Sequence, residues 1–185
     1  MSDITKRAMG RSLKRLMNSR DFDKITVTDI VRDCCVNRQT FYYHFRDIYD
    51  LLEWIYLDEV IFKIERDTNY SNWQDNFLYL FGYMQDNKRF VMNTYKSVDR
   101  SIILNFIFKN YNVIFIKIVD DLSREYQVSD EDKTFIANFY KYGFAGVIEE
   151  WVINGMRYDP EVLLEKLEKM LCGSFAGAIK NMASN

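Results

Sequence analysis

The chain has 185 residues, of which 48% are hydrophobic and 16% aromatic, and its formal net charge is −2 at neutral pH. This length and apolar content allow a substantial buried core, and one Pro with seven Gly residues permits long helices, so we expect an all-α protein. We find no run of roughly 20 uncharged apolar residues that would span a membrane and no apolar signal segment at the N-terminus, so we expect a cytoplasmic protein without a membrane partner.

The first predicted helix carries basic residues around an apolar stripe. Residues 1–46 contain ten Lys or Arg and five Asp or Glu, a net charge of +5, whereas residues 47–185 contain fifteen and twenty-two, a net charge of −7. A basic N-terminal part suits a surface that faces phosphates. For several of these side chains the alternative is a solvated helix face, because they recur at helical spacing. They are Lys6, Arg7, Arg11, Lys14 and Arg15.

Two short helices with their own N-terminal caps follow. Thr26 and Asp29 form a variant of the capping box, in which the hydroxyl accepts a backbone N–H and the carboxylate reaches back. The second helix begins after Asn37, and its Phe41 and Phe45 lie one turn apart on a face that must be buried. Two capped helices joined by a tight turn predict a helix-turn-helix that binds DNA.

The second of these helices has the sequence VNRQTFYYHF, residues 36–45, and is followed by a polar pair and an aliphatic helix. This segment resembles the recognition helix and the start of the fourth helix in TetR-family transcriptional regulators. Thr40, Phe41, Tyr42 and Phe45 match the family pattern position by position. The resemblance implies a DNA-binding transcriptional regulator.

The resemblance also implies the architecture. We expect an all-α fold of about nine helices, with a three-helix helix-turn-helix domain at residues 1–48. Residues 49–185 would form a C-terminal helical bundle for regulation and dimerisation.

Two positions depart from the family pattern. Cys35 stands in the turn where Gly is usual, so a left-handed conformation there would carry a strain of about 1 kcal/mol. The alternative is a slightly remodelled turn. Ile48 replaces a Lys that touches a phosphate. Arg46, or a backbone N–H at the helix start capped by Asp47, would have to supply that contact.

Exposed side chains of the second capped helix are the predicted readers of DNA. Arg38 and Gln39 lie in its first turn, and Arg pairs with guanine and Gln with adenine in the major groove. The other contacts would position the helix against phosphates or the groove wall, as the matching family positions do. The predicted DNA contacts are Thr26, Thr28, Arg38, Gln39, Thr40, Tyr42, Tyr43, His44 and Arg46. One such helix reads only a few base pairs, so we expect a homodimer on double-stranded DNA with a palindromic operator.

Caps and apolar periodicity predict six further helices. They cover about residues 47–67, 73–86, 88–96, 99–122, 129–154 and the segment that begins at Pro160. The far half of the first, with Ile61, Phe62 and Ile64, is expected to pack into the regulatory domain and to link it to the DNA-binding domain.

The last two of these helices resemble the pair that forms a four-helix dimer interface in TetR-type proteins. Small residues would allow close backbone approach, and larger apolar residues form a stripe. An intramolecular core stripe is the competing interpretation. The residues assigned to the dimer interface are Gly143, Gly146, Val147, Trp151, Leu163, Leu167, Leu171 and Ser174.

The family also implies a small-molecule pocket in the C-terminal domain. Eight residues at helical spacing could line it, although such stripes also suit core packing. They are Phe77, Phe81, Met84, Phe90, Tyr95, Phe106, Tyr111 and Phe115. The effector could instead be a partner protein.

We predict no catalytic site, no metal site and no cofactor. His44 is the only histidine, and we find neither a glycine-rich phosphate loop nor a Gly-x-Ser-x-Gly elbow. Cys34, Cys35 and Cys172 lack metal or redox spacing and are expected to be reduced thiols. The alternative to a DNA-binding regulator is a helical adaptor or co-regulator that acts through a protein partner, with little DNA binding of its own.

Overall fold

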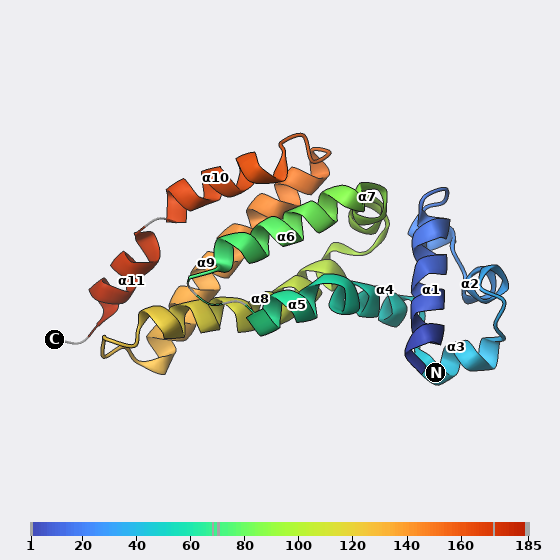
Figure 1. The fold of residues 1–185 in the computed structure, drawn as a ribbon, viewed down its shortest axis with the longest axis horizontal. Coiled ribbons are helices and arrows are strands. Elements are labelled where there is room, and N and C mark those ends of the chain that lie inside the picture. The colour runs from blue at the N-terminus through green and yellow to red at the C-terminus, as the bar shows by residue number, and fades with distance from the viewer. Residues whose placement is uncertain (1, 68, 70, 172, 184–185) are drawn as a thin grey trace.

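The computed structural model describes residues 2–67, 69, 71–171 and 173–183, and every regular element among them is helical (Figure 1). The α-helices are α1 (Ser2–Met17), α2 (Val27–Asp33), α3 (Arg38–His44), α4 (Ile48–Tyr56), α5 (Phe62–Asp67), α6 (Trp73–Asp86), α7 (Lys88–Ser97), α8 (Arg100–Leu122), α9 (Asp130–Ile153), α10 (Pro160–Leu171) and α11 (Ser174–Met182). A 3-10 turn, η1 (Phe22–Lys24), precedes α2, and a π-helical turn, η2 (Leu57–Ile61), joins α4 to α5. The all-α prediction is confirmed.

Helices α1, α2 and α3 form a small lobe at one end of the molecule, and the other helices form a larger bundle (Figure 1). Within the small lobe, the Thr26 hydroxyl accepts the Asp29 N–H at 3.3 Å, and the Asp29 carboxylate accepts the Thr26 N–H at 2.9 Å. The Asn37 side chain accepts the Thr40 N–H at 2.7 Å. Both predicted caps are confirmed, and they define where α2 and α3 begin.

A helical column of α4, η2 and α5 runs from the small lobe into the bundle (Figure 1). In η2 the Phe62 N–H donates to the carbonyl oxygen of Leu57, five residues earlier. This wider turn changes the helical phase. Ile61 and Ile64 are buried as expected, but Phe62 is 55% exposed. The expectation that Phe62 packs into the regulatory bundle was therefore wrong.

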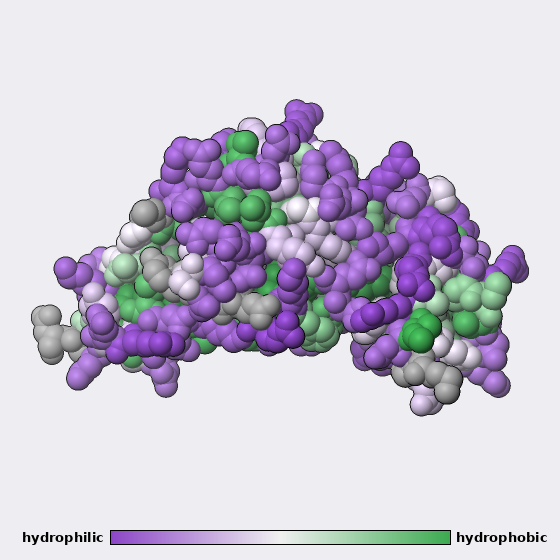
Figure 2. All heavy atoms as spheres, viewed as in Figure 1, coloured by the Kyte–Doolittle hydropathy of each residue, from purple (hydrophilic) through white to green (hydrophobic). Residues whose placement is uncertain are grey.

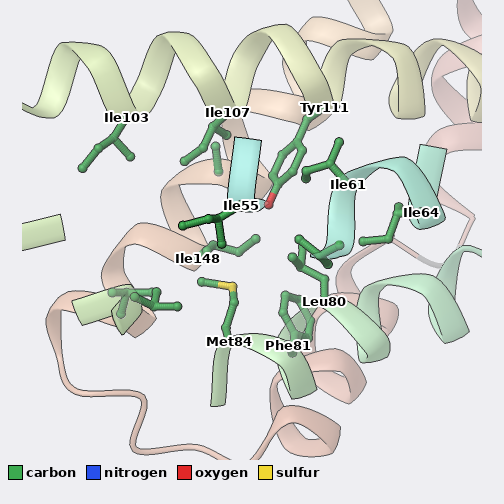
Figure 3. Packing of buried hydrophobic residues seen from close by; sticks show 14 of the residues in the cluster. Ile55, Ile61, Ile64, Leu80, Phe81, Met84, Ile103, Ile107, Tyr111 and Ile148 are labelled. Atoms are coloured by element: carbon green, nitrogen blue, oxygen red, sulfur yellow. The ribbon is translucent and has the colours of Figure 1, made fainter. Parts of the chain in front are cut away.

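The long helices α8 and α9 pack against each other, α10 lies on α6, and α11 contacts both α8 and α9. At the centre, the Phe144 ring of α9 lies 4.2 Å from Phe77 and between 5 and 6 Å from Phe81 and Phe115, as distances between ring centroids. Part of this core is shown in Figure 3. The apolar cluster extends without interruption into the small lobe, as far as Met9 in α1.

Helix α8 is long and apolar enough to cross a membrane, judged by length and composition alone, and no other helix in the described part of the chain is. Lys109 and Lys117 interrupt its sequence, so it contains no run of roughly 20 uncharged apolar residues. In this fold α8 packs against α9 and buries one face within the bundle. The buried residues are Ile103, Ile107, Tyr111, Ile114, Phe115, Ile118 and Val119.

The C-terminal segment, which we expected to be one helix, is two. Pro160 is the first residue of α10, as predicted. Gly173 then adopts a φ of +77°, and α11 begins at the next residue. A left-handed residue ends a helix, which explains the break.

One side chain of α7 fastens the end of α1 to the bundle. The Asn93 amide nitrogen donates to the carbonyl oxygens of Met17 at 2.8 Å and Arg20 at 2.7 Å. Its amide oxygen accepts the N–H of Phe22 at 2.9 Å. Asn93 therefore satisfies three backbone groups of the small lobe from outside that lobe.

Candidate nucleic-acid interface and regulatory cavity

Helix α3 has one buried face and one exposed face. Phe41 is fully buried and packs its ring near Phe45, with 5.8 Å between the centroids. Arg38, Gln39, Tyr42 and Tyr43 are exposed, and Tyr43 reaches 82% exposure. The two phenylalanines anchor α3 to the small lobe. The polar and aromatic side chains on its other face are exposed along the helix and can contact a large surface such as the major groove of DNA.

Two exposed side chains of α3 support each other. Arg38 Nη2 donates to the Tyr42 hydroxyl at 3.3 Å, and the guanidinium lies 5.8 Å from the centroid of that ring. Thr40 is half-buried, and its hydroxyl donates to Asn37 Oδ1 at 2.9 Å. This contact means that Thr40 reinforces the cap of α3.

The other predicted contact residues flank α3. Thr26 and Thr28 are exposed at the start of α2, where the Thr26 hydroxyl is part of the cap. His44 is half-buried beside Tyr43, with ring centroids 4.9 Å apart. Arg46 is exposed and lies 3.5 Å from Asp50, so its charge is partly neutralised.

Much of the positive charge of residues 1–46 is paired within the protein. Arg15 forms an ion pair with Asp33 across the helices of the small lobe. The hydrogen bond from Arg15 holds the pKa of the Asp33 carboxyl below its usual range, with a further contribution from Ser12. Similar pairs join other basic residues to acidic partners: Arg7 with Asp58, Lys14 with Glu59 and Arg20 with Asp29. The net charge of the segment therefore overstates the number of free cations.

The turn between α2 and α3 has the conformation that the family pattern suggested. Cys35 adopts a φ of +55°. The Val36 N–H donates to the carbonyl oxygen of Val31 at 2.9 Å, which closes the end of α2. A non-glycine residue in this region is strained, so Cys35 costs stability to keep α3 in place.

A cavity of about 420 Å³ lies between α4, η2, α6, α7 and α8. This volume falls within the range of roughly 300 to 1,000 Å³ that is typical of small-molecule sites. Of the residues predicted to line a pocket, Met84, Tyr95, Phe106 and Tyr111 line this cavity. The others do not. Phe77, Phe81 and Phe115 surround Phe144 in the core, and Phe90 stacks on Tyr56 with 5.1 Å between the centroids.

Phenol groups supply much of the polar lining inside the cavity. The Tyr56 hydroxyl donates to Thr94 Oγ1 at 3.0 Å, and both residues line the cavity. Burial raises the pKa of Tyr56, Tyr95 and Tyr111 above the ordinary value, and the nearby phenols add to the effect at Tyr111. These groups therefore remain protonated at neutral pH and act as hydrogen-bond donors.

Glu59, on the π-helical turn η2, connects the small lobe to a wall of this cavity. Its carboxylate pairs with Lys14 of α1 and accepts the hydroxyl of Tyr83 at 2.7 Å. Tyr83 lines the cavity, and the Tyr79 hydroxyl donates to the Glu59 carbonyl oxygen at 3.0 Å. No local sequence signal indicates this connection, because it joins residues that are far apart in the chain.

The residues assigned to the dimer interface fall on two different faces. Trp151, Leu163 and Leu167 are buried within the single chain, and the Trp151 indole donates to the Tyr158 carbonyl oxygen at 3.0 Å. Leu171 and Ser174 are half-buried, and the Ser174 hydroxyl donates to the Leu171 carbonyl oxygen. Only Gly143, Gly146 and Val147 are exposed. Trp151, Leu163 and Leu167 therefore pack in the core of the single chain, which is the alternative that the sequence left open for them.

An exposed apolar stripe nevertheless runs along α9. Phe139 is 68% exposed and Ile153 is 65% exposed, and the two side chains lie at equal sequence distances from Gly146. The stripe consists of Phe135, Phe139, Tyr142, Gly143, Gly146, Val147 and Ile153. Figure 2 shows one face of the molecule, mostly hydrophilic, with hydrophobic side chains visible over α10 and on the small lobe.

The chain matches known proteins along most of its length. Residues 12–55 match the family described as bacterial regulatory proteins, tetR family, and residues 71–173 match the family described as transcriptional regulator C-terminal region. The HTH-type dhaKLM operon transcriptional activator DhaS of Lactococcus lactis subsp. lactis (strain IL1403) is 28% identical over 180 residues, which cover 97% of this chain and 92% of the relative.

Solved structures show the same fold. The dihydroxyacetone kinase operon activator DhaS superposes with a TM-score of 0.75 at 26% identity, over 98% of this chain and 99% of that chain. The TetR transcriptional regulator from Streptococcus agalactiae 2603V superposes with a TM-score of 0.61 at 23% identity, over 92% of this chain and 94% of that chain. The helix-turn-helix lobe, the helical bundle and the matched segments together identify the chain as a member of the TetR family of bacterial transcriptional regulators.

Proposed function

We propose that this TetR-family regulator binds double-stranded DNA through α3 and does so as a homodimer on a palindromic operator. The observation that carries the proposal is the exposed face of α3, where Arg38, Gln39, Tyr42 and Tyr43 project from a helix anchored by buried Phe41. Side chains of these types read base edges and contact phosphates in a major groove.

Selection of bound sequences from a random DNA pool tests DNA binding. The parent should enrich a two-fold symmetric site. Arg38→Ala should weaken binding to that site by about 1 to 3 kcal/mol and relax the preference at one base position in each half-site. Lys180→Ala, which removes an exposed positive charge from α11, is the matched control and should bind as the parent does. Enrichment of no sequence by the parent would refute the proposal.

The exposed stripe on α9 supports the homodimer. Large apolar side chains on one face, with Gly143 and Gly146 between them, favour close self-association of helices about a two-fold axis. Phe139→Glu would place like charges near that axis and should give monomers in analytical ultracentrifugation. Phe62→Glu, at an exposed phenylalanine outside the stripe, is the matched control. A parent that is itself monomeric at tens of micromolar would refute this step.

The chain and the DhaS activator match over nearly their whole lengths, which supports a finer proposal. We propose that this regulator activates transcription of an operon for dihydroxyacetone kinase, as the name of that relative states for its own operon. A reporter fused to the promoter of such an operon should lose expression when the regulator is deleted and recover it when the parent gene is restored. A rise in expression on deletion would instead identify a repressor.

Control of DNA affinity would act through the C-terminal bundle. The cavity is large enough for a small ligand and lies beside the column of α4, η2 and α5 that carries the small lobe. Glu59 links the cavity wall to that lobe through its bonds to Tyr83 and Lys14. A ligand can change DNA affinity only by favouring one separation of the two recognition helices. The alternative is a partner protein bound to the bundle. Operator binding that changes with purified small molecules supports the first mode, and a response only to a protein fraction supports the second.

A further inference from the structure

One hydroxyl of the cavity lining forms no hydrogen bond with the described residues. Tyr111 is 5% exposed and lines the cavity, and its hydroxyl has no hydrogen-bond partner within the described ranges. Figure 3 shows the ring directed from α8 into the aliphatic cluster, between Ile61 and Ile107. Within the described ranges the only side-chain polar atom that is both fully enclosed and unpaired is Gln85 Oε1, so the Tyr111 hydroxyl remains accessible and is free to bond a molecule in the cavity.

Two further phenols accompany Tyr111. Tyr95 lines the same cavity, and its hydroxyl likewise has no hydrogen-bond partner among the residues described. The Tyr56 hydroxyl donates a hydrogen bond to Thr94 Oγ1, which leaves the Tyr56 oxygen able to accept one from a ligand. All three remain protonated, since burial raises the pKa of each. The cavity therefore offers two donors and one acceptor to a bound molecule.

The rest of the interior is aliphatic. Its walls are formed by Val60, Ile61, Leu80, Met84, Ile103 and Ile107. The charged residues that border the cavity lie on its exposed side, where Glu53 pairs with Lys109 at 3.8 Å and Arg46 pairs with Asp50. A charged ligand in the interior would lose its hydration without gaining a counter-ion.

We propose that this cavity binds a neutral, largely apolar molecule with a single hydroxyl or carbonyl group, held by the hydroxyls of Tyr111 and Tyr95. The apolar body would lie against the aliphatic walls. Tyr56, Val60 and Ile61 belong to the column that carries the small lobe, so an occupied cavity acts on the orientation of that lobe. The regulatory meaning of this site rests on the proposed function.

A matched set of small probes tests the ligand class. Isothermal titration calorimetry of the full-length parent would compare 4-propylphenol, propylbenzene and 4-propylbenzoate. The phenol should bind tightest, propylbenzene about fivefold to tenfold more weakly, and the anionic benzoate most weakly. Tight binding of the benzoate would overturn the proposal, because it would indicate an anion site near Lys109.

Two variants and a control locate the binding. Tyr111→Phe removes only the hydroxyl and should abolish the preference for the phenol over propylbenzene, while propylbenzene binds as before. Ile107→Trp should fill the cavity and weaken the binding of phenol and propylbenzene alike, whereas Tyr126→Phe, at an exposed loop tyrosine, should behave as the parent does. Thermal unfolding confirms that each variant is folded.

The outcomes also separate this inference from the proposed function. A parent that binds its selected operator but none of the probes, or a Tyr111→Phe variant that keeps the phenol preference, would overturn the cavity proposal alone. A parent that binds the phenol through Tyr111 but enriches no DNA sequence would support the cavity and refute the DNA-binding proposal.

Discussion

Replacing Cys35 by Gly should stabilise the protein. Cys35 has a φ of +55°, where a side chain costs about 1 to 2 kcal/mol. Glycine removes this strain, but its greater freedom in the unfolded chain takes back about 0.5 to 1 kcal/mol. Cys35 is exposed, and its thiol makes only a long contact of 4.0 Å to the Arg32 carbonyl oxygen. The net gain should be about 0.5 to 1 kcal/mol, which raises the unfolding midpoint of a chain of this size by about 1 to 4 °C.

Thermal unfolding followed by far-UV circular dichroism measures this gain. Cys35→Ala is the matched control, because it also removes the thiol but keeps a Cβ in the strained region. It should unfold at or slightly below the parent midpoint. If Cys35→Gly is no more stable than Cys35→Ala, the turn is not strained and the reasoning fails.

Three further predictions concern the small lobe and its attachment. Phe41→Ala should lower the free energy of unfolding by about 3 to 5 kcal/mol in urea titrations, because the ring is fully buried; unchanged stability with lost DNA affinity would reverse its role. In a double-mutant cycle, Glu59→Gln and Lys14→Met should show a coupling of about 1 kcal/mol, and additive effects would argue against the connection between the lobes. The pKa of Asp33 is lowered in the folded state, so its contribution is complete above the unfolded pKa of about 3.9 and is lost as the pH falls through the folded value. In Asp33→Asn the free energy of unfolding, measured by urea titration at a series of pH values, should therefore fall less steeply below about pH 4 than in the parent. An unchanged dependence on pH in that range would contradict this prediction.

Local signals predicted the small lobe well. The caps at Thr26 and Asn37 and the buried pair Phe41 and Phe45 depend on residues within one helical turn of each other, so the sequence alone contains the information. For the turn at Cys35 the sequence left a strained left-handed conformation and a remodelled turn open, and the left-handed conformation is the one observed. The total charge was a weaker guide, because ion pairs between helices depend on the fold.

Helical periodicity did not identify which apolar face of α9 and α10 is buried. Trp151 and Leu163 point inward, whereas Phe139 and Ile153 are exposed, and both sets recur at helical spacing. For the same reason, aromatic spacing could not separate the residues of the cavity from those of the core. At Phe62 the cause is different, because the π-helical turn changes the phase of the helix that follows.

The hydrogen bonds of Asn93 give the small lobe a boundary that differs from its place in the sequence. A peptide that ended near residue 48 would contain the whole small lobe. It would lose the Asn93 side-chain amide, which hydrogen-bonds the backbone of Met17, Arg20 and Phe22. It would also expose core residues that the bundle covers. The part of the chain that we propose to read DNA is therefore smaller than the part that must fold with it. A chimera that takes its small lobe from a related regulator should fold stably only when the segment around residue 93 comes from that regulator too.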